Sequence, residues 1–264
     1  SPTKTISNNT ISSLSNTGNL VTAINSSNGS SVAIATNTIS SISSTSVTAT
    51  SIVSAISVTG GSTIAITNNP ISTLSSANNG SFRGIYVSPL GATSNTISGN
   101  TINGMTSIST GASFSVRGIE VQGTNNATIS ANTISNITSP TTNVVLGAGT
   151  PIVGLYYGSS GTASTITGNT IFSINATATT AINVSAAAIA TGSTAAGGTI
   201  TKNRIYGLTN TTNGTLVGTT NYTIGFLPNG GNWTVANNMI SITNNNTVKA
   251  VGVYDTGATG VRKY

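Results

Sequence analysis

The chain has 264 residues, of which only 4% are charged, with eight Lys or Arg against two acidic residues. The net charge of +6 therefore reflects a shortage of acids, and the basic residues are scattered along the chain. Nucleic-acid binding needs a dense basic stripe, so we expect no nucleic-acid partner. Cysteine is absent, which excludes a disulfide framework. No apolar run approaches the ~18 residues of a membrane-spanning helix, so we expect no membrane insertion.

Ser, Thr, Asn and Gly make up most of the chain. Such a bias is also typical of disordered or mucin-like tracts. Two features favour a folded protein instead. The hydrophobic content is 36%, and the Ile and Val residues recur in register, as a packed core requires.

A ten-residue unit, [TA]-[IV]-x-x-N-x-I-x-x-[ILM], recurs along the chain. It first appears as TISNNTISSL at 5–14, and regular later copies are TISANTISNI at 128–137 and TITGNTIFSI at 165–174. In the eighth copy the last position falls on Thr243 and the pattern weakens. The period is about 33 residues. The central asparagines of the eight copies are Asn9, Asn37, Asn69, Asn100, Asn132, Asn169, Asn203 and Asn238.

A third apolar stretch separates consecutive units. Ankyrin and TPR repeats have a similar period, but β-branched residues dominate here and helix formers are scarce. Each period is therefore expected to hold three short strands. The third stretches are 84–87, 118–121 and 154–157, with looser versions at 55–56, 188–189, 224–226 and 252–254.

The two Ile residues of T-I-x-x-N-x-I are five positions apart, so a straight strand would point them to opposite faces. Both reach one interior only if the chain turns a corner at x-x-N, as at 98–100 and 167–169. Asn and Gly suit a corner because they tolerate left-handed backbone. The spacing predicts two strands that meet at a short, constant corner.

Three strands per period predict an all-β fold. We expect a right-handed parallel β-helix (β-solenoid) of about eight coils, with residues 1–264 forming a single domain. The eight asparagines would then stack as an internal ladder, in which each amide donates to one neighbour and accepts from the other. A column of Asp would place like charges together, whereas a semi-buried amide is tolerated when it is hydrogen-bonded.

These repeats resemble those of the right-handed parallel β-helix superfamily, and more narrowly the Asn-rich "NTI" repeats of secreted and surface bacterial proteins. The resemblance covers nearly the whole chain and implies an extracellular or cell-surface location. The superfamily includes polysaccharide lyases, glycosidases, adhesins, autotransporter passengers and phage tailspikes. The resemblance therefore implies a fold but no single function.

Enzymes of that superfamily resemble one another in using clustered acids. The acids of this chain are Glu120 and Asp255, four coils or about 19 Å apart, too far for a glycosidase pair. His and Cys are absent. We therefore expect no enzymatic activity, no metal site and no cofactor.

Four residues are candidate contacts for a surface glycan. Arg83 and Arg117 precede Gly-Ile in successive coils, and Tyr86 and Tyr156 share the position after Gly-Ile or Gly-Leu. Alternatively, Arg117 pairs with Glu120 and the tyrosines pack under longer corners.

N-x-[ST] sequons mark candidate glycosylation sites, although the composition also produces such matches by chance. They include Asn25, Asn28, Asn126, Asn136, Asn175, Asn210, Asn213, Asn221 and Asn232.

A rank of hydroxyl side chains is expected to point outward beside the second-strand Ile residues. It is flat, uncharged and similar to the Thr arrays of β-solenoid antifreeze proteins, which suggests ice binding. Alternatively, Thr is simply a favourable exposed strand residue, and Ala33, Ala35 and Ala65 interrupt the rank. Its members are Thr96, Ser98, Thr128, Ser130, Thr165, Thr167, Thr199 and Thr201.

The two ends of the chain are complementary, since 253–264 followed by 1–11 resembles the internal stretch 120–134. We therefore expect a segment of a longer repetitive chain, or a unit that stacks end to end on itself. The preferred function is a non-catalytic extracellular structural or adhesive solenoid: a stalk, a surface filament or an adhesin segment. Polysaccharide binding or degradation is the second candidate, and ice binding is the third.

Overall fold

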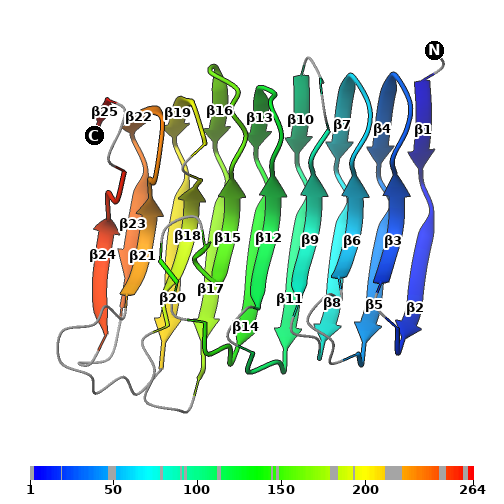
Figure 1. Ribbon diagram of the computed structural model, residues 1–264, viewed down its shortest axis with the longest axis horizontal. Helices are drawn as coiled ribbons and strands as arrows, with labels where there is room; N and C mark the ends of the chain where they lie inside the picture. The colour runs from blue at the N-terminus through cyan, green and yellow to red at the C-terminus, as the bar shows by residue number, and fades with distance from the viewer. Residues whose placement is uncertain are drawn as a thin grey trace.

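The chain forms a parallel β-solenoid in which short strands stack coil upon coil (Figure 1). The described residues contain no α-helix, and so none that is long and apolar enough to span a membrane. The computed structural model describes residues 3–18, 20–46, 52–77, 80–89, 91, 94–111, 114–143, 145–146, 149–178, 184–192, 194–211, 222–243, 248–257 and 261–264.

Three parallel sheets make up the walls of the solenoid, as the three stretches per period predict. Sheet A has nine strands: β1 (Thr3–Ser7), β4 (Ser31–Ala35), β7 (Thr63–Thr67), β10 (Ser94–Ser98), β13 (Ala127–Ser130), β16 (Ser164–Thr167), β19 (Gly197–Thr201), β22 (Asn232–Ala236) and β25 (Arg262–Lys263). Sheet B has eight: β2 (Thr10–Asn16), β5 (Thr38–Ser44), β8 (Pro70–Ser76), β11 (Thr101–Ser107), β14 (Thr133–Ser139), β17 (Thr170–Ala176), β20 (Arg204–Asn210) and β23 (Met239–Ile242). Sheet C has eight: β3 (Leu20–Ser26), β6 (Ile52–Val58), β9 (Ser81–Val87), β12 (Ser115–Val121), β15 (Ile152–Tyr157), β18 (Ala186–Thr191), β21 (Tyr222–Leu227) and β24 (Lys249–Val253).

The corner between sheets A and B is the same in every coil. The residue before each ladder asparagine has positive φ, between 53° and 65°. The sequence suggested that the ladder asparagine itself turns the chain, but the left-handed residue is the one before it. Asn and Gly fill this position in five coils, and Thr36, Ala131 and Lys202 fill it in the others. The constant corner points the Ile residues on both sides into the interior, as with Ile97 and Ile102, which are fully buried.

A second left-handed residue lies within seven of the eight strands of sheet B. In β14, for example, Asn136 has φ 56° and separates Ile134 from Ile137. Residues three apart face opposite sides of a flat strand. Because of the bend at the left-handed residue, both Ile side chains face the interior, where they are fully buried. The sequence pattern contained this spacing, but the second bend was not predicted from it.

Glycine in sheet C allows this wall to approach the facing wall. A Cβ atom on Gly118 would lie 2.6 Å from the carbonyl oxygen of Gly154 and 2.6 Å from Cγ2 of Ile134. No side chain fits there without displacing the backbone of the next coil or the core of sheet B. Glycine is therefore a packing requirement at Gly118, whereas Ala23, Ala55 and Ala188 occupy the equivalent position in other coils of this wall.

The predicted asparagine ladder is confirmed. From Asn9 to Asn203, each Nδ2 donates to Oδ1 of the next ladder asparagine at 2.9–3.1 Å. The same Oδ1 also accepts from the backbone N–H of the preceding asparagine, for example Asn100 N to Asn132 Oδ1 at 3.0 Å. From the second coil onward, each amide also donates to an Ile carbonyl of the preceding coil, as Asn132 does to Ile97 at 2.9 Å. The ladder therefore joins three coils at every step.

The sequence pattern misplaced or missed three strand features. It omitted β3, where Ala23-Ile24 replaces the Gly-Ile signal, and it did not include β25. It also assigned the last interior position of the eighth unit to Thr243. In the structure Ile242 pairs with Leu208, with a register shift. No residue of β23 has positive φ, so Ile240 and Ile242 share one face by ordinary alternation.

Replacing Asn132 with Ala should destabilise the fold by about 1–3 kcal/mol, because Asn100 loses the acceptor of its backbone N–H and buried polar groups are left unpaired. The measurement is the free energy of unfolding in urea.

Ser135 follows the inward-facing Ile134, so strand alternation predicts that it is an exposed control position, but it is 3% exposed and its hydroxyl donates to Asn103 Oδ1. Thr101 is exposed and follows the ladder residue Asn100, so Thr101→Ala is the matched control. It should change the unfolding free energy by less than about 0.5 kcal/mol. Equal losses in the two variants would contradict the role of the ladder.

Candidate functional site

The four candidate glycan contacts do lie together, on the outer face of sheet C. Strand pairing puts Arg83 beside Arg117, and Glu120 between Tyr86 and Tyr156. The Glu120 carboxylate binds both guanidinium groups, with Arg83 Nε at 2.5 Å from Oε2 and Arg117 Nη1 at 2.6 Å from Oε1. The cluster therefore joins three consecutive strands, β9, β12 and β15.

Each arginine of this cluster also stacks on a ring. The guanidinium carbon of Arg83 lies 4.1 Å from the ring centre of Tyr86, and that of Arg117 lies 3.7 Å from the ring centre of Tyr156. Glu120 is 1% exposed and also accepts a hydrogen bond from Gln122. The charges and ring faces that would receive a glycan are thus occupied by one another.

A second apolar layer covers part of the same outer face. Every residue of β15, β18 and β21 is buried, whereas the strands of sheets A and B mostly alternate between buried and exposed residues. Val153, Ala187, Ile224 and Leu227 form this layer with Tyr156, and Leu146 packs against it from a corner segment. Burial raises the pKa of Tyr156 above its usual value, although the charge of Arg117 opposes the shift. Tyr156 is therefore buried within an apolar layer against which a corner residue packs.

The two carboxylates of the chain are far apart. Asp255 follows β24 and is exposed, and its carboxylate accepts from Gly257 N–H and from the Tyr264 hydroxyl. Three strands, β15, β18 and β21, separate β24 from β12, which carries Glu120. Four strand spacings amount to about 19 Å. Among the described residues, no group of three His, Cys, Asp or Glu lies close enough to hold a metal ion.

The outer face of sheet A carries the predicted hydroxyl rank. Strand pairing aligns Thr96, Thr128, Thr165 and Thr199 in one column, and Ser98, Ser130, Thr167 and Thr201 in a second. The first column continues through Thr5, Ala33, Ala65 and Thr234. The hydroxyls of Thr167 and Thr201 lie 3.1 Å apart, so at least one pair is hydrogen-bonded between coils.

The outer face of sheet B holds an aromatic pair that the sequence pattern did not identify. Phe172 and Tyr206 are in register on β17 and β20, with ring centres 4.9 Å apart and ring planes 2° from parallel. Arg204 places its guanidinium carbon 4.9 Å from the Tyr206 ring centre. An alignment of the eight repeats would have revealed the aromatic pair, because Ser or Asn occupies the position of Phe172 and Tyr206 in the other six coils.

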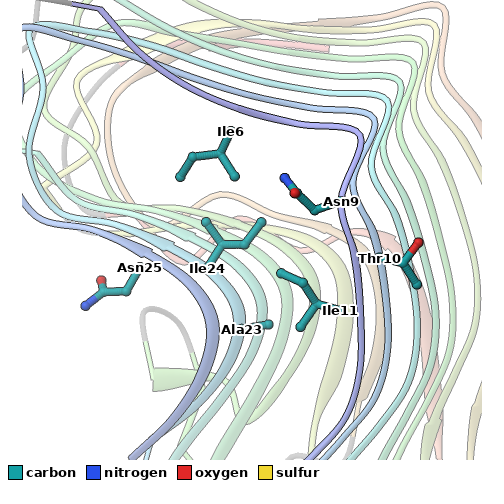
Figure 2. Close-up of a pocket in the computed structure, with 7 residues that line it drawn as sticks. All are labelled: Ile6, Asn9, Thr10, Ile11, Ala23, Ile24 and Asn25. Atoms are coloured by element: carbon teal, nitrogen blue, oxygen red, sulfur yellow. The ribbon is translucent and has the colours of Figure 1, made fainter.

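A pocket of about 450 Å³ lies at the open end of the first coil, and Figure 2 shows it from that end. Ile6, Ile11 and Ile24 point into the space that the coil encloses, and Asn9 points inward from the corner. The pocket is thus the mouth of the solenoid interior, lined by the residue types that later coils bury.

Glu120→Gln should destabilise the fold by about 3 kcal/mol, since it leaves the buried Arg117 without a counter-charge. The measurement is again urea unfolding. Asp255→Asn removes the other carboxylate from an exposed site and should have a much smaller effect. Similar, small effects in both variants would show that the sheet C cluster does not stabilise the fold.

Comparisons with known proteins identify no relative. No protein-family model matches the chain, and neither a curated protein nor a solved structure matches it. The fold and its surfaces are therefore the basis for the proposed function.

Proposed function

We propose that the protein is a non-catalytic structural rod, a stalk or filament segment of a secreted or surface bacterial protein of the Asn-rich NTI type. The observation that carries this proposal is the continuity of the interior. The asparagine ladder runs from Asn9 to Asn238, and Ile columns accompany it through the successive coils. Eight strand spacings make a rod of about 40 Å. The repeated residues therefore hold one coil to the next.

The ends of the ladder support continuation of the rod. In each internal step, the Nδ2 group donates to the next asparagine, but Asn238 donates only to Ile200 and Ala236 among the described residues. At the other end, Asn9 Oδ1 accepts no hydrogen bond from a described residue, and Ile6 and Ile11 are only half-buried. A further coil, from the same chain or from a second copy, would satisfy both ends and cover this apolar surface.

A deletion of residues 10–69 tests the rod. It removes two whole coils and no charged residue. It also joins Asn9 to Pro70, so the Asn-Pro junction that Asn69 and Pro70 form in the native chain is kept. We expect a folded rod that is shorter by about 10 Å, measured by small-angle X-ray scattering. Where the whole protein acts at a surface, the same deletion should weaken that action.

The matched control replaces residues 10–69 with a second copy of 133–203, which also supplies two coils. A spacer tolerates this change of surface because only its length matters. A replacement that abolishes the action despite the restored length would contradict the rod and indicate a specific site within 10–69.

A second candidate function, ice binding, is favoured by the outer face of sheet A. The residues that flank the inward-facing Ile or Val there are Thr, Ser or Ala from β1 to β22, with no charge among them, and the strands hold them in register. Neighbouring residues within one column are separated by the strand spacing of about 4.8 Å. Such a plane presents hydroxyl and methyl groups to water in regular rows, which suits an ordered water layer.

Thermal hysteresis of the purified protein tests this candidate. Thr165→Lys puts a charge in the middle of the rank, between Thr128 and Thr199 in register, and should abolish most of the hysteresis. Thr101→Lys adds the same charge on the exposed face of sheet B and should leave it unchanged. A wild-type protein without hysteresis, or equal loss in both variants, would exclude ice binding by this face.

A further inference from the structure

The outer face of sheet B changes character between β17 and β23. Over the first five strands its central outward column consists of Ser12, Ser40, Ser72, Asn103 and Ser135, which are all small and polar. The next two strands place Phe172 and Tyr206 in that column, and β23 returns to Ser241. Both rings are half-buried, so part of each remains in contact with solvent.

The coil itself does not require these rings. Six other coils form the same corner and the same ladder with Ser or Asn at this position, and five of them also keep the regular strand register. Arg204 departs from the repeat in a similar way, because Thr10, Thr38, Thr101, Thr133 and Thr170 occupy its column in other coils. Three large side chains that the fold does not need are therefore gathered on adjacent strands.

The charges at this patch have no counter-ion among the described residues. Arg204 is exposed, and so is Lys202 at the preceding corner. Glu120 is bound by two arginines on sheet C, and Asp255 follows a strand of that same sheet. The patch thus combines two aromatic rings with two cations that are free to meet an anion from outside.

We propose that Phe172, Tyr206, Arg204 and Lys202 form a binding site for an anionic glycan whose sugars carry carboxylate or sulfate groups. The C–H face of a sugar packs against the exposed part of the stacked rings. The planar Arg204 guanidinium donates two parallel hydrogen bonds to the anionic group, and Lys202 adds a point charge. Thr170 and Ser241, in the neighbouring outward positions, offer hydroxyl groups to the sugar.

The chemistry of the patch fits a glycan better than a nucleic acid. A nucleic-acid strand carries one phosphate per nucleotide and is held by a groove of many cations that follows its backbone. The patch has two cations, and the remaining outward residues of sheet B are mainly Ser, Thr and Asn. Neutral hydrogen-bonding groups suit sugar hydroxyls. The site is independent of the rod proposal, since a rod with or without this patch would stack in the same way.

Isothermal titration calorimetry tests the site with four defined probes. These are a hexamer of galacturonic acid, a sulfated heparin hexasaccharide, the neutral cellohexaose and a thymidine hexanucleotide. We expect at least one anionic glycan to bind, and cellohexaose and the nucleotide to bind much more weakly. The two anionic arms distinguish a carboxylate ligand from a sulfated one. Tighter binding of the nucleotide, or no binding of either anionic glycan, would overturn the proposal.

Variants that restore the repeat residues then locate the site. Phe172→Ser combined with Tyr206→Ser, and separately Arg204→Thr, should each weaken binding about tenfold or more. Lys249→Thr removes an equal charge from an exposed position on sheet C and should have no effect. Circular dichroism confirms that each variant is folded. If the patch variants bind as tightly as the wild type, or if Lys249→Thr weakens binding equally, the site is not on sheet B.

Discussion

The stack of asparagine side chains at one corner is the interaction on which the rest of the solenoid depends. Each amide bonds to the next coil through its neighbour and to the preceding coil through an Ile carbonyl. A buried amide is costly unless its groups are paired, so only one register of one coil on the next is acceptable. With that register fixed, the Ile columns align and the sheets pair strand by strand. The hydrogen bonds of the asparagine stack at the corner thus determine how the apolar side chains of the interior pack.

Because the interior residues hold the coils together, the residues on the outer faces of the three sheets can differ. Sheet A keeps a uniform plane of Thr, Ser and Ala, whereas sheet C carries a buried ion cluster and an added apolar layer. Sheet B is small and polar except at Phe172 and Tyr206. Low charge is consistent with this design, since coils stacked about 4.8 Å apart would place any repeated charge beside its copies. We therefore expect functional differences between the faces to arise from single residues that depart from the repeat.

Much of the fold followed from spacing alone. Two Ile residues five apart around a constant Asn require a corner, and the structure has that corner in every coil. The second bend, at Asn136 and its equivalents, escaped notice because Ser, Thr, Gly and Asn at those positions carry no single signature. The side-chain arrangement on the outer surfaces was harder to predict from the sequence. The pairing of Arg117 with Glu120, which the sequence offered as an alternative, is present, but the second ion pair of Glu120, with Arg83 of the preceding coil, depends on side-chain geometry that the sequence does not show. Phe172 was overlooked because a single aromatic residue in a unit that otherwise matches the repeat is easily taken for chance variation.

The most direct test of the ladder is hydrogen exchange of the side-chain amides, followed by nuclear magnetic resonance. The Asn132 amide is buried and bonded on both sides of its coil, whereas the Asn136 amide is exposed and donates to Asn103. Buried, bonded groups exchange only when the structure opens. A stacked ladder predicts that the Asn132 side-chain protons exchange far more slowly than those of Asn136. Equal, rapid exchange at both residues would contradict it.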